Sequence, residues 1–194
     1  ENAGSYESGL GTYKLYGSRP DPAASSSAPR VAMVQIRSST GTHGTYPLPT
    51  GSGLQLRTVP IGGANQIEVV FSEHVSVQQD DLVLKRSAGS GATVAFTGFS
   101  YNASTWTATW TFASIAADQV LFTLKGTGAT AVVDSAGNAL DGEWTNPSGM
   151  YQGTPATSVF PSGNGAAGGD LVLRLTFLAG DANCDGDVDD LDYQ

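Results

Sequence analysis

A strict alternation of apolar and hydroxyl-bearing residues over positions 106–112 most constrains what this chain can fold into. One face of the alternation holds Trp106, Ala108, Trp110 and Phe112, and the other holds Thr107, Thr109 and Thr111. Successive side chains point to opposite faces of a β-strand, and a period of two cannot line one side of a helix. Because two tryptophans and a phenylalanine share one face, we expect this strand at the centre of the core.

Other short segments alternate similarly and are separated by turn residues such as glycine, serine and proline. The predicted strands cover residues 31–37, 67–71, 82–85, 94–99, 106–112, 120–124, 131–133 and 170–177. Residues 38–60 contain Gly, Thr and Pro throughout and are expected to form an extended loop. No segment of useful length has helical periodicity, and no strand–helix alternation indicates a parallel sheet. The sequence therefore predicts an all-β, antiparallel β-sandwich of about eight strands.

Residues 1–30 differ from the rest in composition and are predicted to form an extended N-terminal arm or linker. The prolines and the Ser/Ala tract at 20–29 remove backbone donors and bury little apolar surface. Tyr13–Tyr16 alternates over a short patch and is expected to pair as a strand with a neighbouring domain or chain. The predicted organisation is an arm over 1–30, a β-sandwich over 31–178 and a C-terminal loop over 179–194.

The C-terminal segment has the ligand spacing of an EF-hand-like calcium loop. With Asp181 as position one, the predicted ligands at positions one, three, five, seven, nine and twelve are Asp181, Asn183, Asp185, Asp187, Asp189 and Asp192. Position seven normally contributes its backbone carbonyl, and Gly186 at position six allows the sharp turn. A hard cation such as Ca2+ takes about 6–8 oxygen ligands. The sequence predicts Ca2+ as cofactor, with a solvated acidic tail as the alternative.

This loop resembles the calcium-binding repeat of type I dockerins. The resemblance rests on Gly-Asp-x-Asn-x-Asp-Gly over residues 180–186 and on Asp192, because aspartate is usual at position twelve of that family. The resemblance covers about the last fifteen residues: it supplies one loop, almost none of the helix that follows the loop in that family, and no second repeat. The resemblance implies calcium binding and docking onto a protein partner.

The body resembles a bacterial Ig-like domain of secreted or surface proteins. The residues that carry the resemblance are Ile67–Val75, Trp106, Trp110 and Val133–Glu143. The resemblance implies an Ig-like β-sandwich that serves as a non-catalytic module. With the scarcity of Lys and Arg, it places the protein outside a bacterial cell, either secreted or at the cell surface.

Several other functional classes find little support in the sequence. The net charge is −9 with only nine Lys and Arg residues, so no basic stripe can neutralise phosphates and nucleic acid is an unexpected partner. No apolar run approaches the roughly 20 residues that span a membrane. Glu73, His74, Asp80 and Asp81 are close in sequence but form no catalytic constellation, so we expect no enzyme and no catalytic residues. Cys184 is the single cysteine, which excludes an internal disulfide.

A second group of oxygen-bearing residues lies at Asp134, Asn138, Asp141 and Glu143. The favoured interpretation is a turn capped by Asp134 and Asn138, because such side chains bond to the nearby backbone. A further calcium site between strand ends is the alternative, although the spacing is not that of an EF-hand loop.

The sequence leaves three functional hypotheses, in this order. The first is an extracellular structural module that binds calcium through the C-terminal loop and mediates protein–protein attachment, adhesion or surface assembly. The second is a self-assembling filament or layer subunit, whose N-terminal arm adds a strand to a neighbour's sheet edge. The third is a carbohydrate-binding accessory domain of a polysaccharide-degrading enzyme. It would bind sugar on a platform of aromatic loop residues, Tyr101, Trp144, Tyr151 and Phe160. Local packing of these side chains is the competing explanation.

Overall fold

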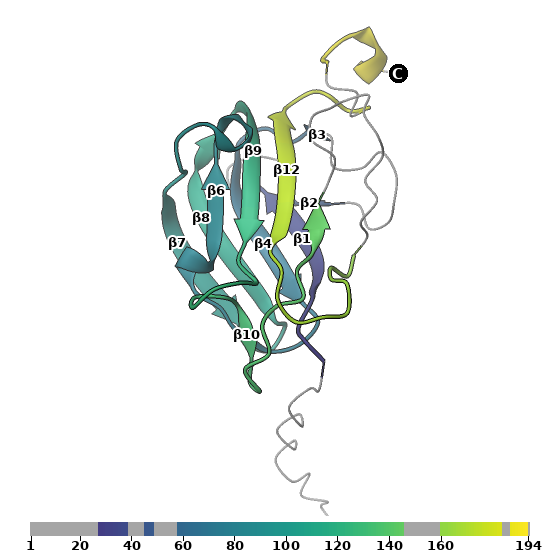
Figure 1. Ribbon diagram of the computed structural model, residues 1–194. Helices are drawn as coiled ribbons and strands as arrows, with labels where there is room; N and C mark the ends of the chain where they lie inside the picture. The colour runs from purple at the N-terminus through teal and green to yellow at the C-terminus, as the bar shows by residue number, and fades with distance from the viewer. Residues whose placement is uncertain (1–26, 39–44, 49–57, 146–159, 184–186, 194) are drawn as a thin grey trace, which may run out of the picture.

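The protein has an all-β fold in a computed structural model that describes residues 27–38, 45–48, 58–145, 160–183 and 187–193. These ranges contain twelve strands and three short 3-10 helices (Figure 1). The 3-10 helices are η1 (Gln79–Asp81), η2 (Ser87–Gly89) and η3 (Asp190–Tyr193). No helix among the described residues is long and apolar enough to cross a membrane.

The first sheet has five strands, and each pair of neighbours is antiparallel. Its order from edge to edge is β2 (Thr45–Pro47), β1 (Val31–Arg37), β4 (Ala64–Phe71), β8 (Thr107–Ile115) and β7 (Phe96–Asn102). The strand predicted at 106–112 corresponds to β8, which lies between the middle strand β4 and the edge strand β7.

The second sheet is built around a long antiparallel pair and lies across the first (Figure 1). Its order is β11 (Trp144–Thr145), β12 (Leu171–Leu178), β9 (Ala117–Leu124) and β6 (Leu82–Lys85). A further strand, β3 (Thr58–Val59), pairs with the end of β12. A separate two-stranded ladder joins β5 (Val75–Ser76) to β10 (Val133–Asp134).

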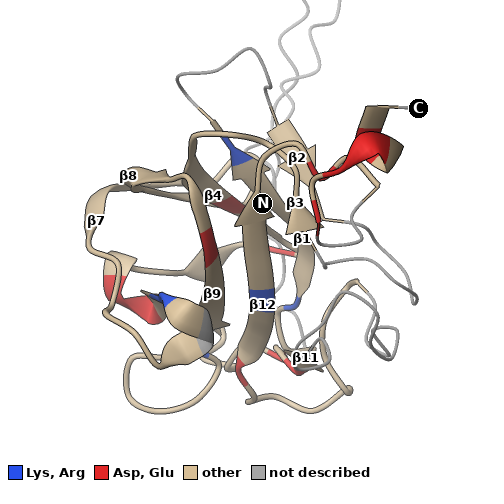
Figure 2. Cartoon of the chain, turned by 90° about the horizontal axis from the view of Figure 1, so that it is seen from above, with Lys and Arg blue, Asp and Glu red and all other residues tan. Residues whose placement is uncertain are grey.

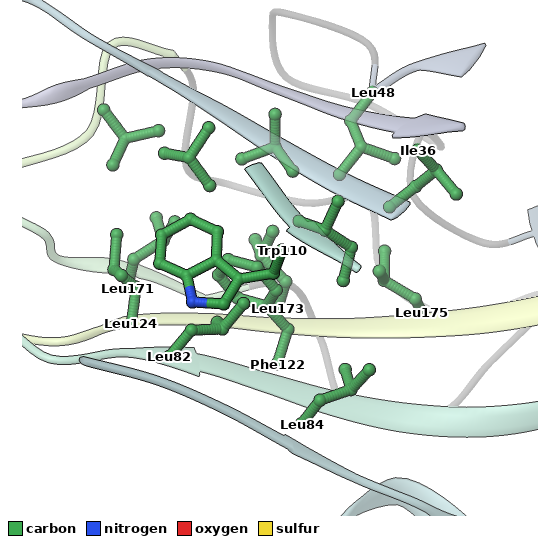
Figure 3. Packing of buried hydrophobic residues seen from close by; sticks show 14 of the residues in the cluster. Ile36, Leu48, Leu82, Leu84, Trp110, Phe122, Leu124, Leu171, Leu173 and Leu175 are labelled. Atoms are coloured by element: carbon green, nitrogen blue, oxygen red, sulfur yellow. The ribbon is translucent and has the colours of Figure 1, made fainter. Parts of the chain in front are cut away.

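The inner faces of the two sheets form one hydrophobic core (Figure 3). Strand β12 contributes every second residue, and Leu171, Leu173, Leu175 and Phe177 are all buried. From the opposite sheet, Trp110 of β8 is fully buried, and its indole N–H donates to the Gln79 carbonyl at 2.9 Å. The period-two pattern thus correctly identified the faces of both strands.

The structure differs from the predicted strand set in number and in direction. Twelve strands are present where about eight were predicted, and the four additional strands, β2, β3, β5 and β11, are only two or three residues long. The predicted loop at 38–60 includes β2 and β3. Both β3 and β11 run parallel to β12, so the sheets are not wholly antiparallel. Strands this short have no periodicity of their own: β2, β3 and β11 form at the edge of a longer strand, whereas β5 and β10 pair with each other.

The predicted boundaries of the two strands in the β7–β8 hairpin differ from those observed. The strand expected at 94–99 is β7, which begins at Phe96 and continues to Asn102. Trp106 lies before β8 and has a left-handed φ of 54°, so it belongs to the turn rather than to the alternating strand. Its carbonyl accepts the Phe71 N–H at 2.9 Å, and its side chain packs partly buried against the core.

The body begins slightly before the predicted boundary at residue 31. The Pro29 carbonyl accepts the Asp141 N–H at 2.8 Å, and the Arg30 carbonyl accepts the Ser72 N–H at 2.8 Å. These two residues, assigned to the arm from composition, are therefore part of the folded body. Tyr13–Tyr16 and the rest of residues 1–26 lie outside the described residues.

The position of Trp110 predicts that it dominates stability. Trp110→Ala removes a fully buried side chain and a hydrogen bond, so we expect the free energy of unfolding to fall by about 3–5 kcal/mol. Leu191→Ala, at a side chain that is 56% exposed, is the control and should change it by less than about 0.5 kcal/mol. Urea unfolding followed by fluorescence measures both. Equal losses in the two variants would contradict this account of the core.

Candidate calcium-binding loop

The predicted calcium loop follows β12 directly and lies beyond the end of that strand (Figure 1). The Gly180 N–H donates to the Pro60 carbonyl at 3.4 Å, and the Asp181 N–H donates to the Leu178 carbonyl at 3.4 Å. Asp181, the first predicted ligand, is fully buried. The start of the loop is therefore attached to the sandwich, although its acidic end is exposed (Figure 2).

The last predicted ligand, Asp192, closes the loop on its own backbone. One carboxylate oxygen accepts the N–H of Ala182 at 2.7 Å and of Asn183 at 3.2 Å. The other oxygen accepts the Asp189 N–H at 2.8 Å. The hydrogen bond from Asp189, with those from Asn183 and Ala182, lowers the pKa of the Asp192 carboxyl. One carboxylate thus joins loop positions two, three, nine and twelve.

Asp189, the ninth position, organises the short helix that ends the described chain. Its carboxylate accepts the Leu191 N–H at 2.8 Å, and its carbonyl accepts the Asp192 N–H at 3.2 Å. A side-chain oxygen that accepts an N–H two residues later is an Asx turn, which favours the start of η3.

The predicted ligands have the donor atoms that calcium requires, but their side chains are not grouped around one point in the described residues. All six offer oxygen, the donor that hard cations prefer. Five of them lie in the described part of the chain, and Asp185 lies outside it. Within the described residues, no three acidic, histidine or cysteine side chains are grouped to hold a metal ion. The Asp189 and Asp192 carboxylates instead accept hydrogen bonds from the loop backbone.

The second oxygen-rich group separates into two unrelated structures. One oxygen of the Asp134 carboxylate accepts the N–H groups of Ala136 and Asn138 at 2.8 Å, and the other accepts the Asn138 amide at 2.8 Å. Burial acts to raise the pKa of Asp134, but these hydrogen bonds outweigh it and the pKa is lowered. The predicted capped turn is confirmed. Asp141 and Glu143 face a different loop, so the alternative of one calcium site through all four residues is wrong.

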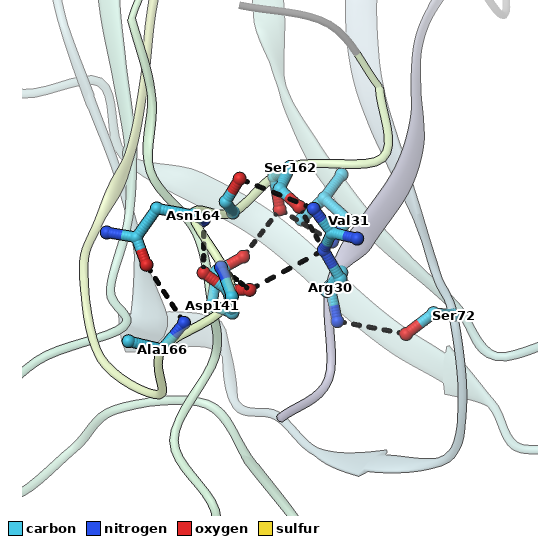
Figure 4. A network of polar contacts seen from close by, with 9 residues as sticks. Arg30, Val31, Ser72, Asp141, Ser162, Asn164 and Ala166 are labelled. Carbon is cyan, nitrogen blue, oxygen red and sulfur yellow. Dashed lines mark hydrogen bonds and ion pairs between the residues drawn. The ribbon is translucent and has the colours of Figure 1, made fainter. Parts of the chain in front are cut away.

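Asp141 belongs to a network that sequence reasoning missed (Figure 4). Its carboxylate accepts the N–H of Asn164 at 2.7 Å and of Gly165 at 3.0 Å, and it lies 3.5 Å from the Arg30 guanidinium. The Ser162 hydroxyl donates to the Asp141 carbonyl and accepts the Val31 N–H. These partners are separated by more than twenty and up to more than a hundred positions, so no local motif indicates them.

The residues weighed as catalytic or sugar-binding have structural partners. The Asp81 carboxylate accepts the Gln78 N–H at 2.7 Å and caps η1, and burial raises its pKa. The Nδ1 atom of His74 lies 3.0 Å from the Tyr101 hydroxyl oxygen, which also accepts a hydrogen bond from the Val75 N–H.

The predicted aromatic platform for sugar is contradicted at two of its four positions. Trp144 and Phe160 are buried and stack on each other, with ring centroids 5.2 Å apart. Tyr101 is bonded to the β5 segment, and Tyr151 lies outside the described residues. Local packing, the competing explanation, accounts for the buried pair.

Comparison of the chain with protein-family models, with curated proteins and with solved structures finds no match.

The Asp192 network makes closure of the loop dependent on pH in the absence of calcium. Because the folded-state pKa is lowered, the stabilisation is present above the ordinary value of 3.8 and is lost as the pH falls through the folded value. Asp192→Asn should therefore reduce hydrogen-exchange protection of the Ala182, Asn183 and Asp189 amides at neutral pH. Asp190→Asn, a neighbouring exposed carboxyl, is the matched control. Equal protection in the two variants would contradict this role of Asp192.

Proposed function

We propose that the chain is a non-catalytic, extracellular bacterial module that binds Ca2+ through residues 181–192 and mediates protein–protein attachment or cell-surface assembly. The observation that carries the proposal is the ligand spacing from Asp181 to Asp192. An Ig-like sandwich is the scaffold proposed for it, in agreement with the all-β fold. Calcium would supply positive charge to a segment with six aspartates in twelve positions.

The position of exposed apolar side chains supports a docking role for this loop. Among the described residues, the exposed large hydrophobic side chains are Val188, Leu191 and Tyr193, which are 46%, 56% and 80% exposed. All three lie between residues 188 and 193, beside the predicted ligands. Clustered exposed apolar residues with a polar rim are typical of protein-interaction sites. Calcium would order this segment so that it presents the three side chains together.

Calorimetric titration with calcium tests the proposal. We expect one site in the wild-type protein and a higher melting temperature, because binding to the folded state stabilises by about 2.7 kcal/mol at 100 times Kd. The double change Asp181→Asn with Asp185→Asn should abolish both effects. Asp190→Asn removes one charge from the same segment at a position that is not a predicted ligand, and it should retain them. A wild-type protein without heat of binding or thermal response would contradict the proposal.

Self-assembly by strand addition is the second candidate function, and the edge strand β7 favours it. The other edges of the two five-stranded sheets are shorter or partly covered: β2 has three residues, β3 and β11 have two each, and β6 has four, of which Leu84 and Lys85 pair with residues 93–94. Strand β7 has seven residues, pairs with β8 on one side, and has no strand partner on its other side within the described residues.

The composition of β7 does not prevent a strand of another chain from pairing with this edge. Its sequence, FTGFSYN, contains no charge and no proline, and Figure 2 shows no charged residue on β7 or β8. Edge strands usually carry charges, particularly lysine, that prevent pairing with another chain. The proposal is that an added strand from a second copy pairs here.

A lysine on this edge distinguishes the two candidate functions. Ser100→Lys places a charge at an exposed position of β7, and Ser135→Lys adds the same charge in an exposed turn as the control. If β7 mediates assembly, sedimentation velocity should show oligomers in the wild type and the control, and monomers in Ser100→Lys. Monomers in all three proteins would exclude β7 assembly and leave the docking module.

A further inference from the structure

Two acidic side chains, the buried Asp141 and the partly exposed Glu143, lie where the N-terminal entry to β1 meets the loop at 160–170. Asp141 is 2% exposed, and its carboxylate has the donors described above from Asn164 and Gly165, with Arg30 beside it. The Asp141 carboxyl group therefore has two backbone donors and a neighbouring cation. It connects three segments that are distant in sequence (Figure 4).

Glu143 lies against this site with poorer compensation. Its carboxyl group lies next to the Asp141 side chain and the Asn164 side chain. Its Oε2 atom is buried and has no hydrogen-bond partner among the described residues. A desolvated carboxylate oxygen without a donor is costly, whereas a neutral carboxyl group is not.

The backbone of the loop passes directly over the two carboxyl groups. Gly163 and Gly169 have left-handed φ values of 102° and 105°. A Cβ atom on Gly163 would fall on the Asp141 carboxylate, and one on Gly169 would fall on the Glu143 carboxyl group. The loop therefore requires glycine at both positions and closes directly over the pair.

The charges that face the pair do not balance two carboxylates. Arg30 faces it from the N-terminal segment, and its side chain is 38% exposed. Asn164 faces it from the loop as an uncharged amide. Asp170, at the end of that loop, is directed to the N–H groups of Gly126 and Thr127. Two ionised carboxylates would therefore share the single positive charge of Arg30, with the buried Oε2 of Glu143 lacking a donor among the described residues.

We propose that Glu143 and Asp141 share one proton and act as a pH-dependent latch, in which a Glu143 carboxyl donates to the Asp141 carboxylate. The protonated pair fastens the loop at 162–169 over the entry to β1. Loss of the proton places two negative charges in contact, and their repulsion loosens the loop. This inference is independent of the proposed function at the C-terminal loop.

The direction of the pH dependence follows from the environment of Glu143. Burial, and then the neighbouring Asp141 side chain and charge, raise the pKa of Glu143 above its ordinary value of 4.5. A raised folded-state pKa gives stability that is present below the ordinary value and lost as the pH rises through the folded value. The latch is therefore closed in acid and opens toward higher pH, opposite in sign to the Asp192 network.

Glu143→Gln tests the latch because glutamine keeps the shape and donates to Asp141 at every pH. The wild type should lose about tenfold in its folded-to-unfolded ratio per pH unit between the unfolded and folded pKa values of Glu143. The variant should lack this loss, so its advantage in denaturant titrations grows with pH. Glu68→Gln, a carboxyl paired with Arg37 on the sheet face, is the control and should keep the wild-type slope.

Carbon-13 NMR of the Glu143 carboxyl carbon in the wild type gives a second measurement that does not depend on a variant folding. We expect its titration above 4.5, and we expect Asp141→Asn to move it back toward that value. Hydrogen-exchange protection of the Asn164 and Gly165 amides should fall over the same pH range. Titration of Glu143 at or below 4.5, or a Glu143→Gln variant that is less stable than wild type at every pH, would overturn the proposal.

Discussion

The structure depends on the burial of the apolar face of β12 against the opposite sheet. Strand β12 pairs with β9 over its whole length, and its other edge pairs with the short strands β11 and β3. Its four inward side chains meet the face that carries Trp110. Because β12 leads directly into Asp181, packing of this strand also fixes where the acidic loop leaves the sandwich. The core and the candidate site are consecutive parts of one chain segment.

The sequence predicted well those features that repeat locally. Alternation identified β8 and β12, their inward faces and the all-β class, because side-chain direction in a strand depends only on position parity. Alternation also assigned Trp106 to this strand, but Trp106 has a left-handed φ and belongs to the turn before β8. Short strands such as β3 could not be predicted, because their pairing depends on a distant partner.

The candidate site was predictable in composition and less so in geometry. Spacing identifies six oxygen donors, yet it does not reveal that Asp192 bonds to the Ala182 and Asp189 backbone or that Asp181 is buried. The Arg30–Asp141–Ser162 network had no sequence signal at all, since its members meet only through the tertiary fold. Two acidic regions thus differ physically. The described C-terminal aspartates are mostly exposed, whereas Asp141 is buried and the partly exposed Glu143 has one buried carboxyl oxygen.

The central claim, that residues 181–192 bind calcium, is tested most directly by mapping amide chemical shifts during a calcium titration. We expect one equivalent of calcium to shift the amides of residues 180–193, with the two sheets unchanged apart from the end of β12. Saturation at one equivalent would also give the stoichiometry. An unchanged spectrum would contradict the account, as would shifts confined to the region of Asp141 and Glu143.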